Sequence, residues 1–128
     1  MAGQKLAFHE AGHYTVARQQ GAPVVSCEVR RDDGATYGAQ VMSDPRGKIA
    51  VLMAGGIAEE LVWGPSGTEG YGSEDDKRQL AAVLHALHPA CHAYKLAEGE
   101  RIARSALSER WALLEGVAER LWLTGRFP

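Results

Sequence analysis

The sequence predicts a mainly helical domain, α+β in class, with one small antiparallel β-sheet. Apolar residues recur at helical spacing in four segments. Only two short runs are rich in β-prone residues, and they flank a single Asp-Gly turn signal. The length of 128 residues fits one domain that spans residues 1–128.

The first part of the chain predicts a helix followed by a hairpin. Residues 4–20 have the pattern of a helix, and Gly21 and Pro23 then end it. The β-prone runs at residues 24–31 and 35–43 surround the turn "DDGA". Such a turn between two such runs predicts an antiparallel hairpin.

A second helix is expected over residues 48–62. It contains Gly55 and Gly56, and each glycine costs up to ~1 kcal/mol relative to alanine inside a helix. We therefore expect close packing of another segment at this place. The remaining elements are a glycine-rich loop over residues 64–72, a third helix from Ser73 towards Pro89, and a last helix over residues 108–123.

Composition excludes several classes of protein. The net charge of −2 gives no basic surface for nucleic acid. The longest uncharged stretch, Ile49 to Ala58, is too short for a membrane span. Cys27 and Cys91 form no CxxC pair and are too few for a disulfide scaffold. Together with the lack of a charged-then-apolar leader, this favours a cytoplasmic location.

The segment "FHEAGHYTVA" carries two histidines, His9 and His13, on either side of Glu10. Residues four apart share one face of a helix, so both imidazoles can bind one metal ion. Zinc suits imidazole and lowers the pKa of a bound water from ~15.7 towards ~7, and Glu10 can take a proton from that water. This HExxH pattern predicts zinc ligands at His9 and His13 and a general base at Glu10. The small Ala11 and Gly12 allow another backbone segment to approach closely.

A catalytic zinc site also needs a third protein ligand and one open position. Ser73 and Asp76 have capping-box spacing, which gives Asp76 a structural role and leaves Asp75 for the metal. Glu60 lies in an apolar stripe of the second helix. It is a candidate metal ligand or a candidate hydrogen-bond partner of a histidine, and the bland alternative is an exposed residue at the helix end. The residue pattern alone does not choose between Asp75 and Glu60. The neighbouring Glu59 is a further acidic candidate on that helix.

The segment "HALHPACH" places His85, His88 and His92 at helical spacing, next to Cys91. A second metal site is one interpretation of these histidines. Pro89 interrupts the helix between them, and a metal site needs converging ligands. A polar helix end is the stronger interpretation.

Two stretches resemble one known family. "AFHEAGHYTVA" resembles the start of the peptidase domain of FtsH-type ATP-dependent zinc proteases, and "AGGIAEELVWGPSGTEGYGSEDD" resembles that family's Gly-Gly segment and the Ser-x-Asp element after it. The resemblance implies His9, His13 and Asp75 as zinc ligands, with Glu10 as the base. This chain departs from the family pattern in having Gly56 for an arginine and Asp76 for an apolar residue.

The resemblance implies a zinc-dependent metalloendopeptidase. The sequence has no GxxxxGK[ST] phosphate loop, so we expect cleavage that is independent of ATP and limited to flexible or unfolded polypeptides. Such a substrate would pair with the strand at residues 35–42. The family also suggests a homo-oligomer or a separate unfoldase as partners. The alternative is a non-catalytic zinc-binding or protein-interaction module of the same ancestry.

Overall fold

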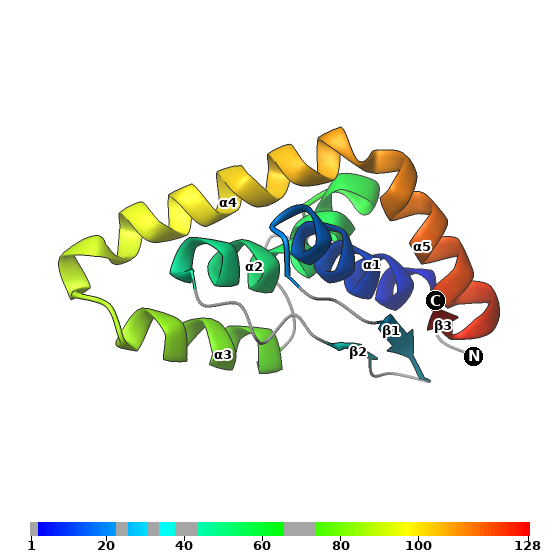
Figure 1. The fold of residues 1–128 in the computed structure, drawn as a ribbon, viewed down its shortest axis with the longest axis horizontal. Helices are drawn as coiled ribbons and strands as arrows, with labels where there is room; N and C mark the ends of the chain where they lie inside the picture. Colours follow the sequence, from blue (N-terminus) through cyan, green and yellow to red (C-terminus); the bar gives the residue numbers. More distant parts are fainter. Residues whose placement is uncertain (1–2, 23–25, 31–33, 38–43, 66–73) are drawn as a thin grey trace.

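The computed structural model of the protein describes residues 3–22, 26–30, 34–37, 44–65 and 74–128. It is mainly helical with a small antiparallel sheet, so the predicted fold class is confirmed (Figure 1). The helices are α1 (Gln4–Gln19), α2 (Pro45–Trp63), α3 (Glu74–His85), α4 (His92–Glu109) and α5 (Trp111–Thr124). A 3-10 turn, η2 (Pro89–Cys91), precedes α4, and the strands are β1 (Ser26–Val29), β2 (Gly34–Tyr37) and β3 (Arg126–Phe127).

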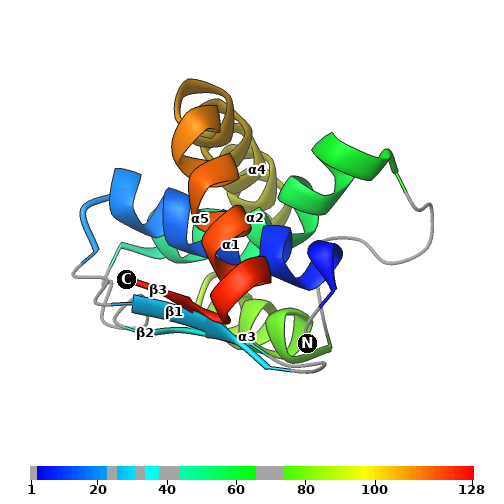
Figure 2. The ribbon, with the colours of Figure 1, turned by 90° about the vertical axis from the view of Figure 1, so that its right-hand side faces the viewer.

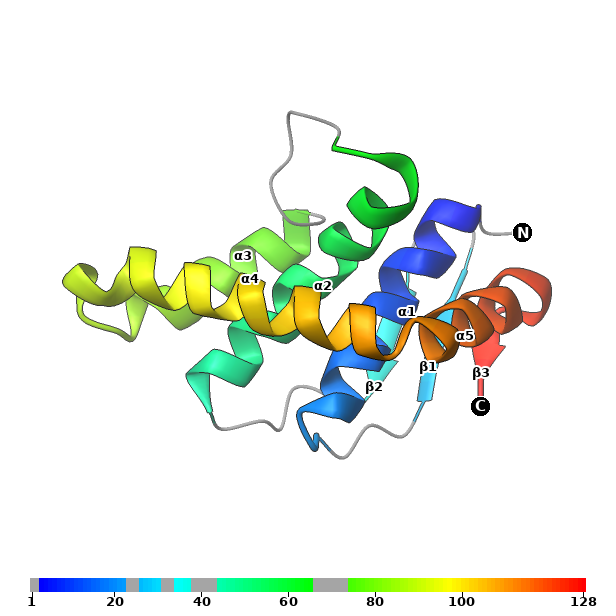
Figure 3. The same ribbon diagram turned by 90° about the horizontal axis from the view of Figure 1, so that it is seen from above.

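The helices α1 and α2 form the centre of the molecule and pack against each other. On one side they are covered by α4 and α5, which cross above them in Figure 3. The sheet and α3 lie on the opposite side (Figures 1 and 2). The interface between α1 and α2 is therefore an interior layer, and side chains placed there are shielded from water.

The described strands pair in the order β2-β1-β3, and both pairings are antiparallel. The predicted hairpin is confirmed, because Cys27 lies opposite Thr36 and Val29 opposite Gly34. The strand β3 was not predicted, since two residues carry no usable alternation. Predicted strand residues 38–43 lie outside the described ranges.

Two helices begin or end differently from the prediction. The helix α2 begins earlier than expected, with Pro45 in its first turn and the Asp44 side chain accepting a hydrogen bond from the Arg46 N–H at 2.9 Å. The expected last helix over residues 108–123 is wrong at its start, because α4 runs through Glu109 and α5 begins at Trp111. No helix was predicted for α4, whose sequence is interrupted by Gly99 and has a polar majority.

The core is built from large aliphatic side chains on the central and covering helices. The fully buried ones are Ile49, Met53 and Ile57 of α2, Leu107 of α4, and Leu114 and Leu121 of α5. By contrast, α3 has no buried residue and contributes only partly buried apolar side chains. Within the described part of the chain, no helix combines the length and apolar character needed to cross a bilayer.

Close contact between α1 and α2 depends on Gly12. A Cβ atom at this position would lie 2.6 Å from the Ala54 carbonyl oxygen and 2.8 Å from the Ala58 Cβ. Gly116 of α5 is the opposite case, because a Cβ there would meet nothing within 4 Å. The expected approach of a backbone segment at Gly12 is therefore found, and α2 provides that segment.

We expect Gly12→Ala to lower the free energy of unfolding by about 1–3 kcal/mol, because the added methyl group forces the two helices apart. Gly116→Ala is the matched control, and we expect it to raise that free energy by up to about 1 kcal/mol through helix propensity alone. Urea denaturation of both variants measures the difference. Equal stability of the two variants would contradict the close crossing.

Candidate metal centre

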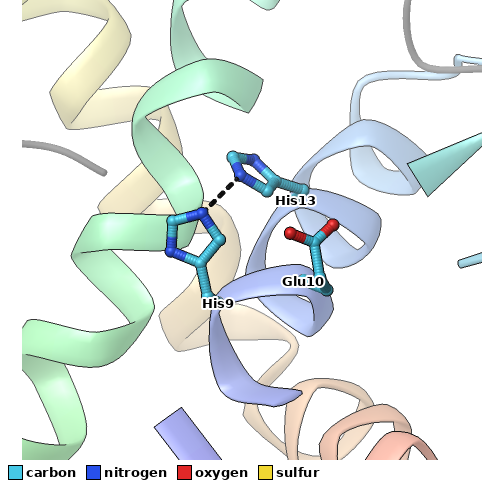
Figure 4. A group of neighbouring side chains, drawn as sticks. All are labelled: His9, Glu10 and His13. Atoms are coloured by element: carbon cyan, nitrogen blue, oxygen red, sulfur yellow. Dashed lines mark hydrogen bonds between the residues drawn. The ribbon is translucent and has the colours of Figure 1, made fainter. Parts of the chain in front are cut away.

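His9 and His13 lie one turn apart on α1, and both are 6% exposed. Their Nε2 atoms are 3.1 Å apart, and the two rings stand nearly perpendicular with centroids 4.7 Å apart. Figure 4 shows the two imidazoles meeting at these nitrogens, with Glu10 beside them. The helical spacing of the motif thus gives the convergence of nitrogens that was expected from it.

The helix α2 fixes the orientation of both rings through their other nitrogens. Nδ1 of His13 donates to the Val51 carbonyl oxygen at 2.6 Å, and Nδ1 of His9 lies 3.4 Å from a Glu59 carboxylate oxygen. An acceptor at Nδ1 keeps the proton there and leaves the Nε2 lone pair of a neutral ring free. Both histidines are therefore oriented to use Nε2 as a ligand atom.

A third donor reaches this point from α3. The Asp76 Oδ2 atom lies 2.7 Å from Nε2 of His9 and 3.2 Å from Nε2 of His13. Asp75 instead turns outward and contacts Arg78 and Gln79 of its own helix. The structure thus places Asp76 beside the two histidines and not Asp75, the residue expected there, because on a helix adjacent residues face different directions and only one of these two faces α1.

The other interpretations of the acidic residues are also settled by position. The Asp76 carboxylate is directed at the histidines, and Ser73, its expected capping partner, lies outside the described residues. Glu60 forms an ion pair with Arg104 of α4, and Arg104 also contacts Glu100. The ion pair of Glu60 therefore links α2 to α4. Of the two neighbouring glutamates, Glu59 is the one that contacts a histidine.

Glu10 is buried on the same helix, with 6% of its surface exposed. One ligand atom from each of His9, Glu10 and His13 lies within 4.8 Å of the others. This buried group could hold a metal ion.

The electrostatics of the centre favour a positive charge next to Asp76. Burial lowers the pKa of His9, but its hydrogen bonds to Asp76 and Glu59 outweigh burial and raise that pKa to about 10. Burial also lowers the pKa of His13, but the hydrogen bond to Asp76 outweighs burial, so the pKa of His13 is raised. Burial raises the pKa of Asp76, yet the bonds from His13 and His9 hold it well below its ordinary range. A ring proton or a metal ion supplies the charge that this carboxylate requires.

The donor set fits a divalent transition metal. Two imidazole nitrogens and one carboxylate oxygen converge, and each imidazole has an acceptor at its second nitrogen. This set of two nitrogens and one oxygen is one that zinc accepts in catalytic sites with three protein ligands.

The other histidines do not form a second centre. The His88 Nδ1 accepts the Ala90 backbone N–H at 3.1 Å, and the His92 Nε2 donates to the Leu87 carbonyl oxygen at 3.1 Å. His85 is exposed at the end of α3. The polar-helix-end interpretation therefore describes this segment.

The two cysteines lie apart from each other and are both free. Cys27 is buried in β1, and burial together with the nearby Glu10 carboxylate raises the pKa of its thiol to about 12. Cys91 is exposed on η2. Cys27 is therefore an inert thiol at neutral pH, in agreement with the interpretation from the sequence.

Comparison of the sequence with models of protein families gives no match, and comparison with curated proteins gives none either. The assignment of a function therefore depends on the site itself. Sequence reasoning missed two of its residues, Val51 and the role of Glu59. A backbone carbonyl such as that of Val51 leaves no mark in a sequence, whereas the Glu59 side chain lies on the helix face that contains Val51 and Gly55.

We expect Glu59→Ala to weaken metal binding by about 10–100-fold, the usual effect of removing the hydrogen-bond partner of a ligand histidine. Glu59→Gln keeps an acceptor oxygen and should lose less. The matched control is Glu60→Ala, which removes the neighbouring carboxylate without touching His9. Competition with a chromogenic chelator measures all three affinities, and equal losses for Glu59→Ala and Glu60→Ala would contradict the role of Glu59.

Proposed function

We propose that this protein is a zinc-dependent metalloendopeptidase that hydrolyses peptide bonds of flexible or unfolded polypeptides. The observation that carries the proposal is the convergence of three donor atoms, Nε2 of His9, Nε2 of His13 and Oδ2 of Asp76, beside the buried carboxylate of Glu10. The resemblance of the first motif to FtsH-type peptidase domains supports the same class of reaction.

In this proposal His9, His13 and Asp76 hold the zinc ion. An ion bound there would supply Lewis acidity, both for a water nucleophile and for negative charge on a substrate carbonyl oxygen. The protein supplies the orientation: Val51 holds the ring of His13, and Glu59 holds the ring of His9. Because these contacts exist before substrate arrives, the site is preorganised for binding.

Glu10 is the general base. It follows His9 directly on α1, so its carboxylate lies beside the two imidazoles (Figure 4). A carboxylate oxygen of Glu10 accepts a proton as water attacks the scissile carbonyl carbon and then returns that proton to the nitrogen of the leaving amine. Burial of Glu10 keeps this exchange away from bulk water.

The strand β2 is the proposed docking edge for substrate. The central strand β1 pairs with β2 on one side and β3 on the other, so among the described strands β2 is an edge strand. The helix α1 packs against both β1 and β2, which brings the edge near the metal helix. An extended polypeptide can pair with such an edge through backbone hydrogen bonds, and this recognition selects unfolded chains.

The proposed class of substrate is the one that these 128 residues can act on by themselves. The sequence has no phosphate-binding loop, and folded domains hold ~5–15 kcal/mol against unfolding. A peptide-bond hydrolase without an unfoldase therefore acts on chains that are already extended. A separate unfoldase, or assembly of several copies, would widen the range of substrates.

The test is a time course of cleavage by the zinc-loaded protein. We expect slow degradation of casein, loss of activity with a chelator, recovery with zinc, no effect of ATP, and no attack on a stably folded domain. Rapid degradation of the folded domain would contradict the restriction to extended chains. Stoichiometric zinc binding without cleavage of either substrate would contradict the peptidase proposal and support the non-catalytic zinc-binding module. A protein that binds no zinc would contradict both of these functions.

A further inference from the structure

Three residues of α2 face the metal helix at intervals of four. Val51 and Glu59 contact the Nδ1 atoms of His13 and His9 and so hold the two rings from the ends of the row. Gly55 lies midway between them, opposite the place where the two Nε2 atoms meet at 3.1 Å. The row therefore has acceptors at both ends and no side chain in its middle.

A side chain at residue 55 has no space in this arrangement. A Cβ atom there would lie 2.6 Å from Nε2 of His9, 2.6 Å from Nε2 of His13 and 2.6 Å from Cε1 of His9. Nonbonded carbon atoms do not approach ring nitrogens so closely, because favourable contacts begin at about 3.5 Å. Any side chain at this position would occupy the space next to both ligand nitrogens.

The atoms near Gly55 differ in kind from those near Gly12. A Cβ at Gly12 would collide with the Ala54 carbonyl oxygen, a backbone atom that moves only if the helices separate. A Cβ at Gly55 would collide with the ends of two side chains, His9 and His13, which can rotate aside. The first glycine serves helix packing, whereas the second leaves room for the imidazoles.

We infer that Gly55 is a positioning residue of the metal centre, and that its missing side chain provides the space in which the two imidazoles converge on an ion. This inference rests on the proposed function, because it requires a metal between His9 and His13. The absence of a side chain at Gly55 is thus required for metal binding and not for folding. An alanine at this position should leave a folded protein with separated nitrogens.

The experiment compares wild type, Gly55→Ala and the control Gly116→Ala by Co²⁺ and Zn²⁺ titration. We expect Gly55→Ala to lose at least ~100-fold in affinity, the upper end of the effect of a lost outer partner. Its visible Co²⁺ absorption should be lost or altered, while circular dichroism and thermal unfolding of the metal-free protein stay close to wild type. Gly116→Ala should match wild type in metal affinity and Co²⁺ absorption, since a Cβ there meets nothing, and should differ only by the small gain in thermal stability that helix propensity gives.

Wild-type Co²⁺ affinity and absorption in Gly55→Ala would overturn the inference while leaving the proposed function intact. A wild type that binds neither ion would overturn both. If Gly55→Ala does not fold, the triple variant His9→Ala/His13→Ala/Gly55→Ala decides, because only removal of both imidazole rings vacates the space of the added methyl group. Recovery of the fold supports the inference, and continued unfolding shows that Gly55 serves helix packing instead.

Discussion

Asp76→Ala is expected to abolish stoichiometric metal binding, and Asp75→Ala is expected to leave it unchanged. The two residues are adjacent aspartates on the same helix, so each substitution removes the same side chain and Asp75→Ala is a close control for Asp76→Ala. Only Asp76 lies within 2.7 Å and 3.2 Å of the two imidazole nitrogens, whereas Asp75 contacts Arg78 and Gln79 near the surface. Loss of a charged ligand should exceed the ~10–100-fold effect that is typical of a lost outer partner.

Elemental analysis after dialysis, together with chelator competition, measures zinc in both variants. Thermal unfolding in excess chelator serves as the control, because it shows whether each variant is folded without metal. Retention of zinc by Asp76→Ala together with its loss from Asp75→Ala would reverse the assignment and restore the interpretation drawn from sequence resemblance. Retention by both would mean that the third ligand is another residue.

Glu10→Gln is expected to lower the rate of casein cleavage by about 10²–10⁴-fold, the usual contribution of a general acid–base group. Glutamine keeps the size and a carbonyl oxygen but cannot accept the proton of the attacking water. The ligand atoms of His9, His13 and Asp76 are unchanged, so zinc content should remain at the wild-type level. Activity and zinc content therefore separate in this variant.

The measurement pairs a cleavage assay with elemental analysis of the same sample. A Glu10→Gln variant that keeps more than a tenth of the activity with zinc bound would remove Glu10 from its proposed role. A variant that loses zinc together with activity would show that Glu10 helps to bind the metal, which the 4.8 Å grouping of His9, Glu10 and His13 allows geometrically. The Asp76→Ala and Glu10→Gln results thus distinguish ligand from base.

Much of this fold was predictable because its signals are local. The HExxH helix, the second helix and the hairpin each have their own periodicity or turn residues, and all three are found. The helix α4 was missed because Gly99 lowers helix propensity in its middle. Its place is explained by packing that a sequence does not display: a Cβ at Gly99 would lie 3.0 Å from Cβ of Ile49.

The candidate site was predictable only in its first half. His9, Glu10 and His13 share a turn of helix, so their relation is fixed by helical geometry. The third donor comes from an element that lies 63 residues beyond His13, and its identity depends on how α3 is rotated against α1. Two adjacent aspartates offer the same chemistry on two different faces of α3. Capping logic favoured Asp75, whereas Asp76 is the one that faces the histidines.

The weak attachment of α3 has a consequence for how the centre responds to metal. This helix has no buried residue, and its apolar side chains Leu80, Val83 and Leu84 are only partly covered, yet it supplies Asp76. An ion that binds only when Asp76 is in place stabilises the docked helix by RT ln(1 + [ion]/Kd), which is about 2.7 kcal/mol at a hundredfold excess over Kd. By linkage, each event increases the probability of the other. The concentration of the free ion would then set both the fraction of centres that are occupied and the fraction of molecules in which α3 is docked beside the two histidines.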